Sequence, residues 1–196
     1  MALLRLNNNY QLLETFSHPL SFQGCRECHM CCDGSVFHFA PLLLDDCSEV
    51  APYFPLFLAK IENNLRLVML YGREACFYFS SYGCMIYSHR PPACQSYPLS
   101  PFFDKIVVDT ACHALGDEGE LLWNQDYTLC SRFKTRRLEN FATKYYETLK
   151  ILEEQYTSHL KWKIRLFNID LYGLEGKSQL AYTLHNSWQK FSFLRD

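Results

Sequence analysis

Four cysteines lie within eight residues near the start of this 196-residue chain, and their spacing constrains its fold more than any other feature. The segment reads Cys25-Arg-Glu-Cys28-His-Met-Cys31-Cys32. Disulfides between residues this close would form only small loops, which constrain the unfolded chain little. A Cys-x2-Cys spacing instead lets one turn of backbone direct two or three thiolates at the same metal. The cluster therefore predicts a region that is organised around a metal.

The composition indicates a globular protein of a reducing compartment. Hydrophobic residues make up 48% of the chain and charged residues 20%, which is typical of a folded domain. The first residues lack the apolar core of a signal peptide, and no stretch is long and apolar enough to cross a membrane. We therefore expect a cytoplasmic protein without membrane contact, in which clustered cysteines are metal ligands rather than disulfides. The net charge of −2 does not indicate a nucleic-acid partner.

The distribution of cysteines divides the chain into two parts. Nine of the ten lie between Cys25 and Cys112, and the last 66 residues contain none. We expect a single composite domain over residues 1–196, with a metal-binding region at about 20–125 and a helical extension at about 130–196. The predicted fold class is α+β: a small metal-organised, cysteine-rich core with short strands and helices, followed by a mainly helical C-terminal part.

Hydrophobic periodicity and turn residues predict the individual elements. The residues after 161 carry no clear pattern. Strands are expected over 36–39, 65–70, 74–79 and 105–110, short helices over about 45–51 and 56–63, and one long amphipathic helix over 136–159.

The thiols indicate which metals the chain binds. Thiolates are soft donors that select zinc, copper(I) or iron–sulfur clusters over magnesium or calcium. Neighbouring side chains diverge on a strand or a helix, which argues against one zinc ion binding both Cys31 and Cys32. The pair is instead expected to face different metals or to span a multinuclear centre. The candidate ligands for the metal or cluster are Cys25, Cys28, Cys31, Cys32, Cys76, Cys84, Cys94 and Cys112.

Other polar residues near the thiols have supporting roles in this interpretation. Arg90, held by the rigid Pro91 and Pro92, could offset the negative charge of a thiolate centre. Cys47 and Cys130 have no partner at motif spacing and are interpreted as structural. Nearby histidines are interpreted as surface or supporting residues, since thiols are plentiful; they are His29, His89 and His113.

The arrangement of the eight cysteines resembles the YkgJ-type CxxCxxCC cysteine-cluster family, a zinc- or iron-chelating domain. The resemblance covers about Cys25 to Gly119, with Gln95 and His113 departing from residues common in the family. It implies metal or iron–sulfur binding. The motifs that carry it are Cys25-x-x-Cys28-x-x-Cys31-Cys32, Cys76, Tyr82-Gly83-Cys84-Met-Ile86-Tyr87, Arg90-Pro91-Pro92-Ala-Cys94-Gln-Ser-Tyr97-Pro98 and Cys112-His-Ala-Leu-Gly116.

Three functions remain open from the sequence. The first is an iron–sulfur or iron-binding protein, with [4Fe–4S] as one form of the cluster, and the second is a structural zinc protein. The third is a metal-dependent enzyme with a protein substrate or partner, such as a protein-lysine methyltransferase or a redox partner, since the resemblance implies a relation to a domain that occurs in flagellin lysine methylases. No GxGxxG loop follows a predicted strand, so the residues themselves do not indicate a nucleotide-like cofactor.

Overall fold

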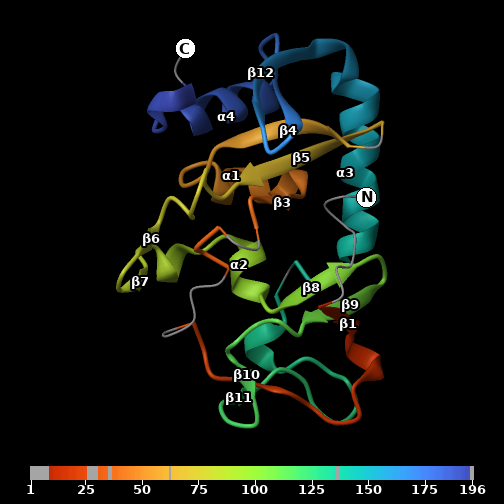
Figure 1. Ribbon diagram of the computed structural model, residues 1–196. Helices are drawn as coiled ribbons and strands as arrows, with labels where there is room; N and C mark the ends of the chain where they lie inside the picture. The colour runs from red at the N-terminus through yellow and green to blue at the C-terminus, as the bar shows by residue number, and fades with distance from the viewer. Residues whose placement is uncertain (1–8, 26–30, 35–36, 62, 136, 195–196) are drawn as a thin grey trace.

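Strands dominate the fold. The computed structural model describes residues 9–25, 31–34, 37–61, 63–135 and 137–194. Within these ranges the chain forms 13 strands in four sheets, together with four α-helices. Figure 1 shows a larger sheet at the top, two smaller sheets at the bottom, and the long helix α3 along one side of the molecule. Helix α3 (Phe141–Tyr156) contacts β5 above and β8 below, so it joins the two parts.

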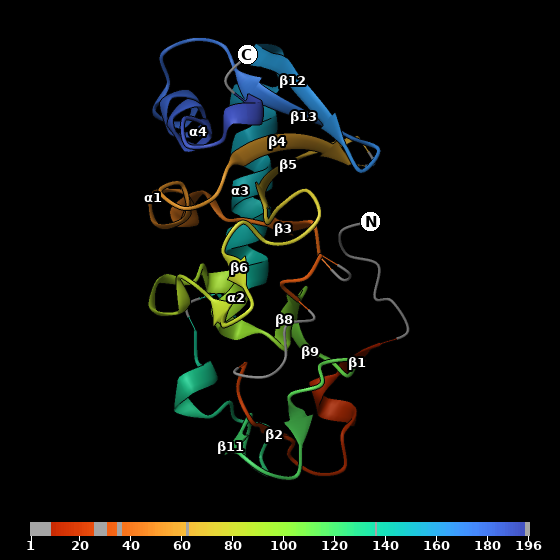
Figure 2. The same cartoon turned by 60° about the vertical axis from the view of Figure 1, so that its left-hand side comes forward.

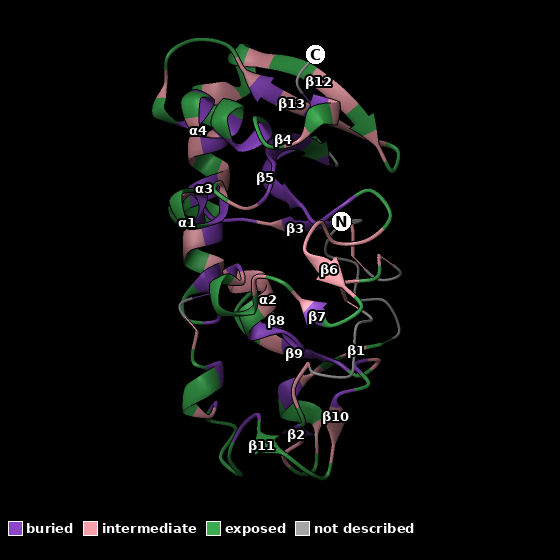
Figure 3. Ribbon diagram, turned by 90° about the vertical axis from the view of Figure 1, so that its left-hand side faces the viewer, coloured by how far each residue is buried: buried purple, intermediate pink, exposed green. Residues whose placement is uncertain are grey.

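The upper part is an antiparallel five-stranded sheet in the order β12-β13-β4-β5-β3. Its central strands are almost completely buried (Figure 3), because helices α3 and α4 and the short α1 pack around it. Trp188 of α4 donates from Nε1 to the Leu56 carbonyl at 2.7 Å, which ties this helix to the sheet. The elements are β3 (Phe39–Pro41), α1 (Cys47–Val50), β4 (Leu56–Ile61), β5 (Asn64–Leu70), β12 (Leu160–Leu166), β13 (Ile169–Leu174) and α4 (Gln179–Trp188).

The lower part contains two small sheets, in the orders β1-β9-β8 and β10-β2-β11. A second apolar cluster, centred on Trp123 and Leu99, fills the space between them. Figure 2 shows β8 at the upper edge of the lower part, on the side that faces β3 of the upper sheet. The strands are β1 (Tyr10–Leu12), β2 (Ser21–Phe22), β8 (Leu99–Phe102), β9 (Lys105–Asp109), β10 (Leu115–Gly116) and β11 (Glu120–Leu121).

The cysteine segments lie between the two parts. Here the hairpin of β6 (Phe79–Ser80) and β7 (Gly83–Cys84) is followed by helix α2 (Pro92–Ser96). Phe37 packs against both apolar clusters, and its ring lies 5.7 Å from that of Tyr97. The segment that follows the N-terminal cysteines is therefore held by both halves of the protein.

The prediction of a mainly helical C-terminal part is wrong. Residues 160–174 form the β12–β13 hairpin, which extends the upper sheet through β13 and β4. Among the described residues after 130, the α-helices are α3 and α4, with three short 3-10 helices beside them. The hairpin turns at Phe167 and Asn168, both with positive φ. Such a turn usually carries Asn-Gly or Asp-Gly, so Phe-Asn gave no recognisable turn signal in the sequence.

Three local predictions also fail, whereas others hold. The strand expected at 36–39 begins only at Phe39 and runs to Pro41, and residue 36 lies outside the described residues. Residues 56–61 are strand β4 rather than a helix, because a short apolar run buried on both faces has no period that separates the two. Residues 74–78 are turns rather than a strand, since the backbone at Gly72 folds back onto Ala75. The helix near 45–51, the strands near 65–70 and 105–110 and most of the long helix are confirmed. In the described part of the chain, no helix is long and apolar enough to span a membrane.

Candidate metal centre

The N-terminal cysteine segment is fixed directly onto the segment that carries Cys76. The Cys76 amide donates to the Cys32 carbonyl at 2.7 Å. Gly34 has a φ of +85°, and a Cβ atom built there would lie only 1.5 Å from the Glu74 carbonyl oxygen. Only glycine permits both this conformation and this approach. The turn at Asp33-Gly34 therefore positions Cys32 against Cys76.

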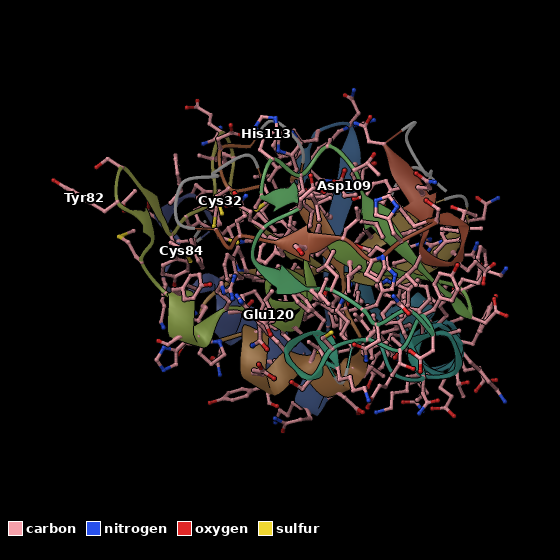
Figure 4. The ribbon with its side chains drawn as sticks, turned by 90° about the horizontal axis from the view of Figure 1, so that it is seen from below. Cys32, Tyr82, Cys84, Asp109, His113 and Glu120 are labelled. Atoms are coloured by element: carbon pink, nitrogen blue, oxygen red, sulfur yellow. The ribbon has the colours of Figure 1, made fainter. Side chains whose placement is uncertain are left out.

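The β6–β7 hairpin carries Cys84 and projects from the molecule. Ser80 donates from Oγ to the Gly83 carbonyl at 2.9 Å, and Gly83 has a φ of +101° at the turn. Figure 4 shows Cys84 on this hairpin and Tyr82 at its tip, pointing into solvent, whereas Cys32 lies further inside. Tyr82 is 98% exposed. The tight turn directs the hairpin base, and with it Cys84, toward the other thiols.

Helix α2 supplies Cys94, and the residues before it supply a cation. Pro92 begins the helix, as its fixed φ favours, and the Cys94 thiol donates to the Tyr71 hydroxyl at 3.8 Å. Arg90 packs over the Tyr87 ring at 3.9 Å and donates from Nη1 to the Cys25 sulfur at 3.7 Å. The predicted role of Arg90 beside a thiol thus agrees with its position.

Cys32 lies at the centre of the described thiols. Its sulfur is 3.9 Å from that of Cys31, so the adjacent side chains do not diverge, contrary to the expectation from regular elements. The pKa values of Cys31 and Cys76 are both raised. The largest cause is a hydrogen bond with Cys32, and the second is burial. Cys32 also adds to the pKa rise that burial produces in Cys84 and Cys94, which reaches about 12 for Cys94. Without a metal these four thiols are neutral at pH 7.

Six of the eight predicted ligands line one cavity of about 520 Å³. No disulfide joins any two of the described cysteines. The described residues include no group of three or more His, Cys, Asp or Glu side chains already spaced to hold a metal, so the thiols would have to turn toward a bound ion. The six cavity cysteines are Cys25, Cys31, Cys32, Cys76, Cys84 and Cys94.

The two other predicted ligands differ in position. Cys28 lies outside the described residues, as does His29. Cys112 is 4% exposed and belongs to the lower apolar cluster, and it is not among the described residues that line the cavity. It is nevertheless near the site, because Cys112 and Cys31 both act on Tyr97. Burial and Asp109 make the largest contributions to the raised pKa of Tyr97, and the two cysteines add to them.

Several cavity residues were missed by the sequence interpretation. Tyr71 contacts Cys94, and His38 stacks on Phe167 with ring centroids 3.6 Å apart. Arg137, from the segment before α3, is almost completely buried at the cavity wall. Burial lowers the pKa of Arg137, and Asp46, Tyr71 and Cys94 oppose this effect. Only the pairing of distant segments shows that these residues share a site.

His89 and His113 are not among the described cavity residues, and Cys47 and Cys130 also lie elsewhere.

Thiols that converge from four chain segments on one cavity are typical of cysteine-based metal-binding proteins. A family model agrees with this class. The CxxCxxCC family, described as "Putative zinc- or iron-chelating domain", matches residues 24–157, and the chain belongs to this family. The resemblance inferred from the cysteine motifs is thereby confirmed. No curated protein and no solved structure matches the chain.

Proposed function

We propose that the protein holds a polynuclear metal centre, with an iron–sulfur cluster as the favoured form, through the thiols around Cys32. The observation that carries this proposal is the convergence of six cysteines on one cavity. A single structural zinc ion needs only four ligands. Cys28, which precedes Cys31 by three residues, adds a further thiol to the set, and Cys112 near Tyr97 completes the eight. This excess of thiols favours a cluster or a pair of metals over one zinc ion.

The charges around the cavity suit such a centre. A four-thiolate zinc or [4Fe–4S] site carries about two negative charges, which nearby cations and backbone amides stabilise. Two arginines, Arg90 and Arg137, line the cavity, and no acidic side chain does so among its described residues. When bound, the cluster would supply electron transfer or a Lewis-acidic iron. The chain itself supplies soft ligands, compensating charge and an opening beside them.

The cavity also distinguishes this site from a closed structural zinc site, in which the metal is not accessible. Structural zinc is enclosed by four protein ligands, whereas sites that bind a ligand keep access to the metal. A cavity of about 520 Å³ lies within the size range of small-molecule sites. The accessible centre is the feature that the enzyme hypothesis requires.

Anaerobic reconstitution tests the proposal. The reduced full-length chain is incubated with iron and sulfide, desalted, and analysed for iron, sulfide and visible absorption. We expect coloured protein with several iron and sulfide ions per chain. Cys32→Ser and Cys94→Ser should each lose more than half of the iron, and Cys130→Ser, a half-buried cysteine outside the cavity, should retain it. Colourless, iron-free wild-type protein would contradict the cluster.

Zinc is the second candidate, and the separation of Cys31 and Cys32 favours it. Two zinc–sulfur bonds of about 2.3 Å at a tetrahedral angle place their sulfurs roughly 3.8 Å apart, close to the observed 3.9 Å. A zinc protein would instead bind one or two zinc ions per chain under the same anaerobic conditions. Removing that zinc with a chelator should unfold the cysteine region, which circular dichroism and limited proteolysis can detect.

A further inference from the structure

The cavity extends beyond the thiols into an apolar compartment. The cysteines come from the segments around residues 25–32 and 76–94. A further part of the wall is formed by residues of β3, β8, the start of α3 and the β12–β13 turn. This wall carries mostly aromatic and aliphatic side chains, among them Phe39, Phe102 and Phe141. A metal centre does not need such a compartment, but an organic ligand does.

Arg137 provides a single buried cation at this wall. Its side chain is 5% exposed, and its Nη2 donates to the Pro41 carbonyl at 3.0 Å. Its Nη1 is buried and has no hydrogen-bond partner among the described atoms. The Cζ atom lies 5.1 Å from the centroid of the Phe141 ring. A buried guanidinium nitrogen without a partner is rare, because the lost hydration must be replaced by another acceptor.

Asp46 forms an ion pair with this nitrogen but does not accept a hydrogen bond from it. Its Oδ2 atom is 3.8 Å from Arg137 Nη1, which is beyond hydrogen-bond distance, and it already accepts from the Leu43 amide at 3.0 Å. Asp46 is also not among the described residues that line the cavity. Nη1 itself is covered in this structure, but Arg137 lines the cavity, so a turn of its side chain would bring Nη1 to an acceptor that enters from there. A planar carboxylate matches the guanidinium best.

The turn between β12 and β13 covers the apolar compartment. Leu166 pairs with Ile169, so Phe167 and Asn168 form a two-residue turn, in which both have the positive φ that such hairpins require. The turn places the Phe167 ring in the cavity wall, stacked on His38 and edge-on to Phe39 at 5.7 Å. The family match ends at residue 157, so this cover lies outside the matched region.

From these contacts we infer that the compartment between Arg137 and Phe167 binds a small organic monocarboxylate with an apolar body. The carboxylate pairs with Arg137, and the apolar body packs between Phe141 and the β12–β13 turn. This site goes beyond the proposed metal centre and does not require it. The rival explanation is that Arg137 only offsets the charge of a thiolate centre, since Cys94 also acts on its pKa.

Binding of a defined series of probes tests the inference. Benzoate, 4-phenylbutyrate and octanoate are titrated into the full-length chain, metal-free and metal-loaded, by isothermal titration calorimetry. The neutral amide of each acid is titrated in parallel. We expect at least one acid to bind at least tenfold more tightly than its amide, with or without metal.

Variants with matched controls locate the site. Arg137→Gln should weaken binding of that acid at least tenfold, and Phe167→Ala several-fold. Arg66→Gln is the control for the first, because Arg66 is another buried arginine with an unpartnered nitrogen, outside the described cavity lining. Phe103→Ala is the control for the second, because Phe103 also has a positive φ in a hairpin turn but is 49% exposed. Both controls should bind the acid within twofold of the wild type.

The outcomes separate this inference from the metal proposal. Acids that bind no better than their amides, or an unchanged affinity in Arg137→Gln, would overturn the carboxylate site. Loss of metal content in Arg137→Gln without any carboxylate binding by the wild type would identify Arg137 as a counter-ion instead. Failure to load iron or zinc, with carboxylate binding intact, would contradict only the metal centre.

Discussion

Gly34 holds the two cysteine segments together, so replacing it with alanine should separate them. A Cβ atom at Gly34 would lie 1.5 Å from the Glu74 carbonyl oxygen and 2.6 Å from the Glu74 carbonyl carbon. The two backbones must move apart by about 2 Å to reach ordinary contact. The nearby 2.7 Å hydrogen bond from the Cys76 amide to the Cys32 carbonyl cannot survive such a shift.

Two contributions set the expected loss of stability. A non-glycine residue at a positive φ of this kind costs about 1–3 kcal/mol. The lost hydrogen bond adds about 0.5–1.5 kcal/mol, and the clash adds more where the segments cannot relax. The total is smaller than the 5–15 kcal/mol that stabilises most domains, so the variant should still fold. Its metal affinity should fall about 10- to 100-fold or more, because the positions of Cys32 and Cys76 depend on this contact.

Gly176→Ala is the matched control for the backbone conformation. Gly176 has a φ of +96°, but a Cβ atom there meets nothing within 4 Å. Urea unfolding and metal content after anaerobic reconstitution are measured for both variants. Gly176→Ala should lose about 1–3 kcal/mol and bind metal normally. If Gly34→Ala matched it in both stability and metal content, the contact would not hold the site together and the reasoning would be refuted.

Three further predictions concern the scaffold. Ser187→Ala should cost about 1–3 kcal/mol in urea unfolding, because the buried Leu56 amide loses the acceptor Ser187 Oγ, which lies 2.9 Å away. An unchanged midpoint would contradict this. Leu171→Ala should lower the free energy of unfolding by about 2–5 kcal/mol, since Leu171 is fully buried in β13. A loss below about 1 kcal/mol would show that neighbouring side chains fill the space left by Leu171. Burial raises the pKa of Cys47 from 9.0 to about 12. The contribution of the neutral Cys47 thiol to the free energy of unfolding is therefore full below pH 9 and declines as the pH rises toward 12. Unfolding of the reduced protein between pH 8 and 11 should show this loss, and Cys47→Ala should reduce it.

Local sequence patterns predicted the elements that have clear local signals. The long helix was recognised because its apolar residues recur at helical spacing, although it begins at Phe141 rather than near residue 136. Asn140 adopts a left-handed conformation with a φ of 54°, which starts the helix later than its periodicity suggests. The segment at 56–61 failed because its burial on both faces comes from strand pairing and helix packing, which are not local properties.

The site was predicted in part for the same reason. The thiols were found because their spacing is itself the signal, and the position of Arg90 beside Cys25 agrees with its predicted role. Arg137 gave no such signal, since its partner Pro41 lies 96 residues away. Phe167 reaches His38 only because the β12–β13 hairpin joins the sheet beside β4.

The sequence by itself determined the order and spacing of eight thiols, which predict binding of soft metals, and membership of the CxxCxxCC family. These follow from residue type and short spacing, which folding does not change. Only the tertiary structure decided that Cys31 and Cys32 face the same cavity, that Cys112 lies apart from its wall, and that an apolar compartment with a buried arginine adjoins the thiols. Those features depend on contacts between strands distant in sequence, whose pairing is set by the packing of the whole chain.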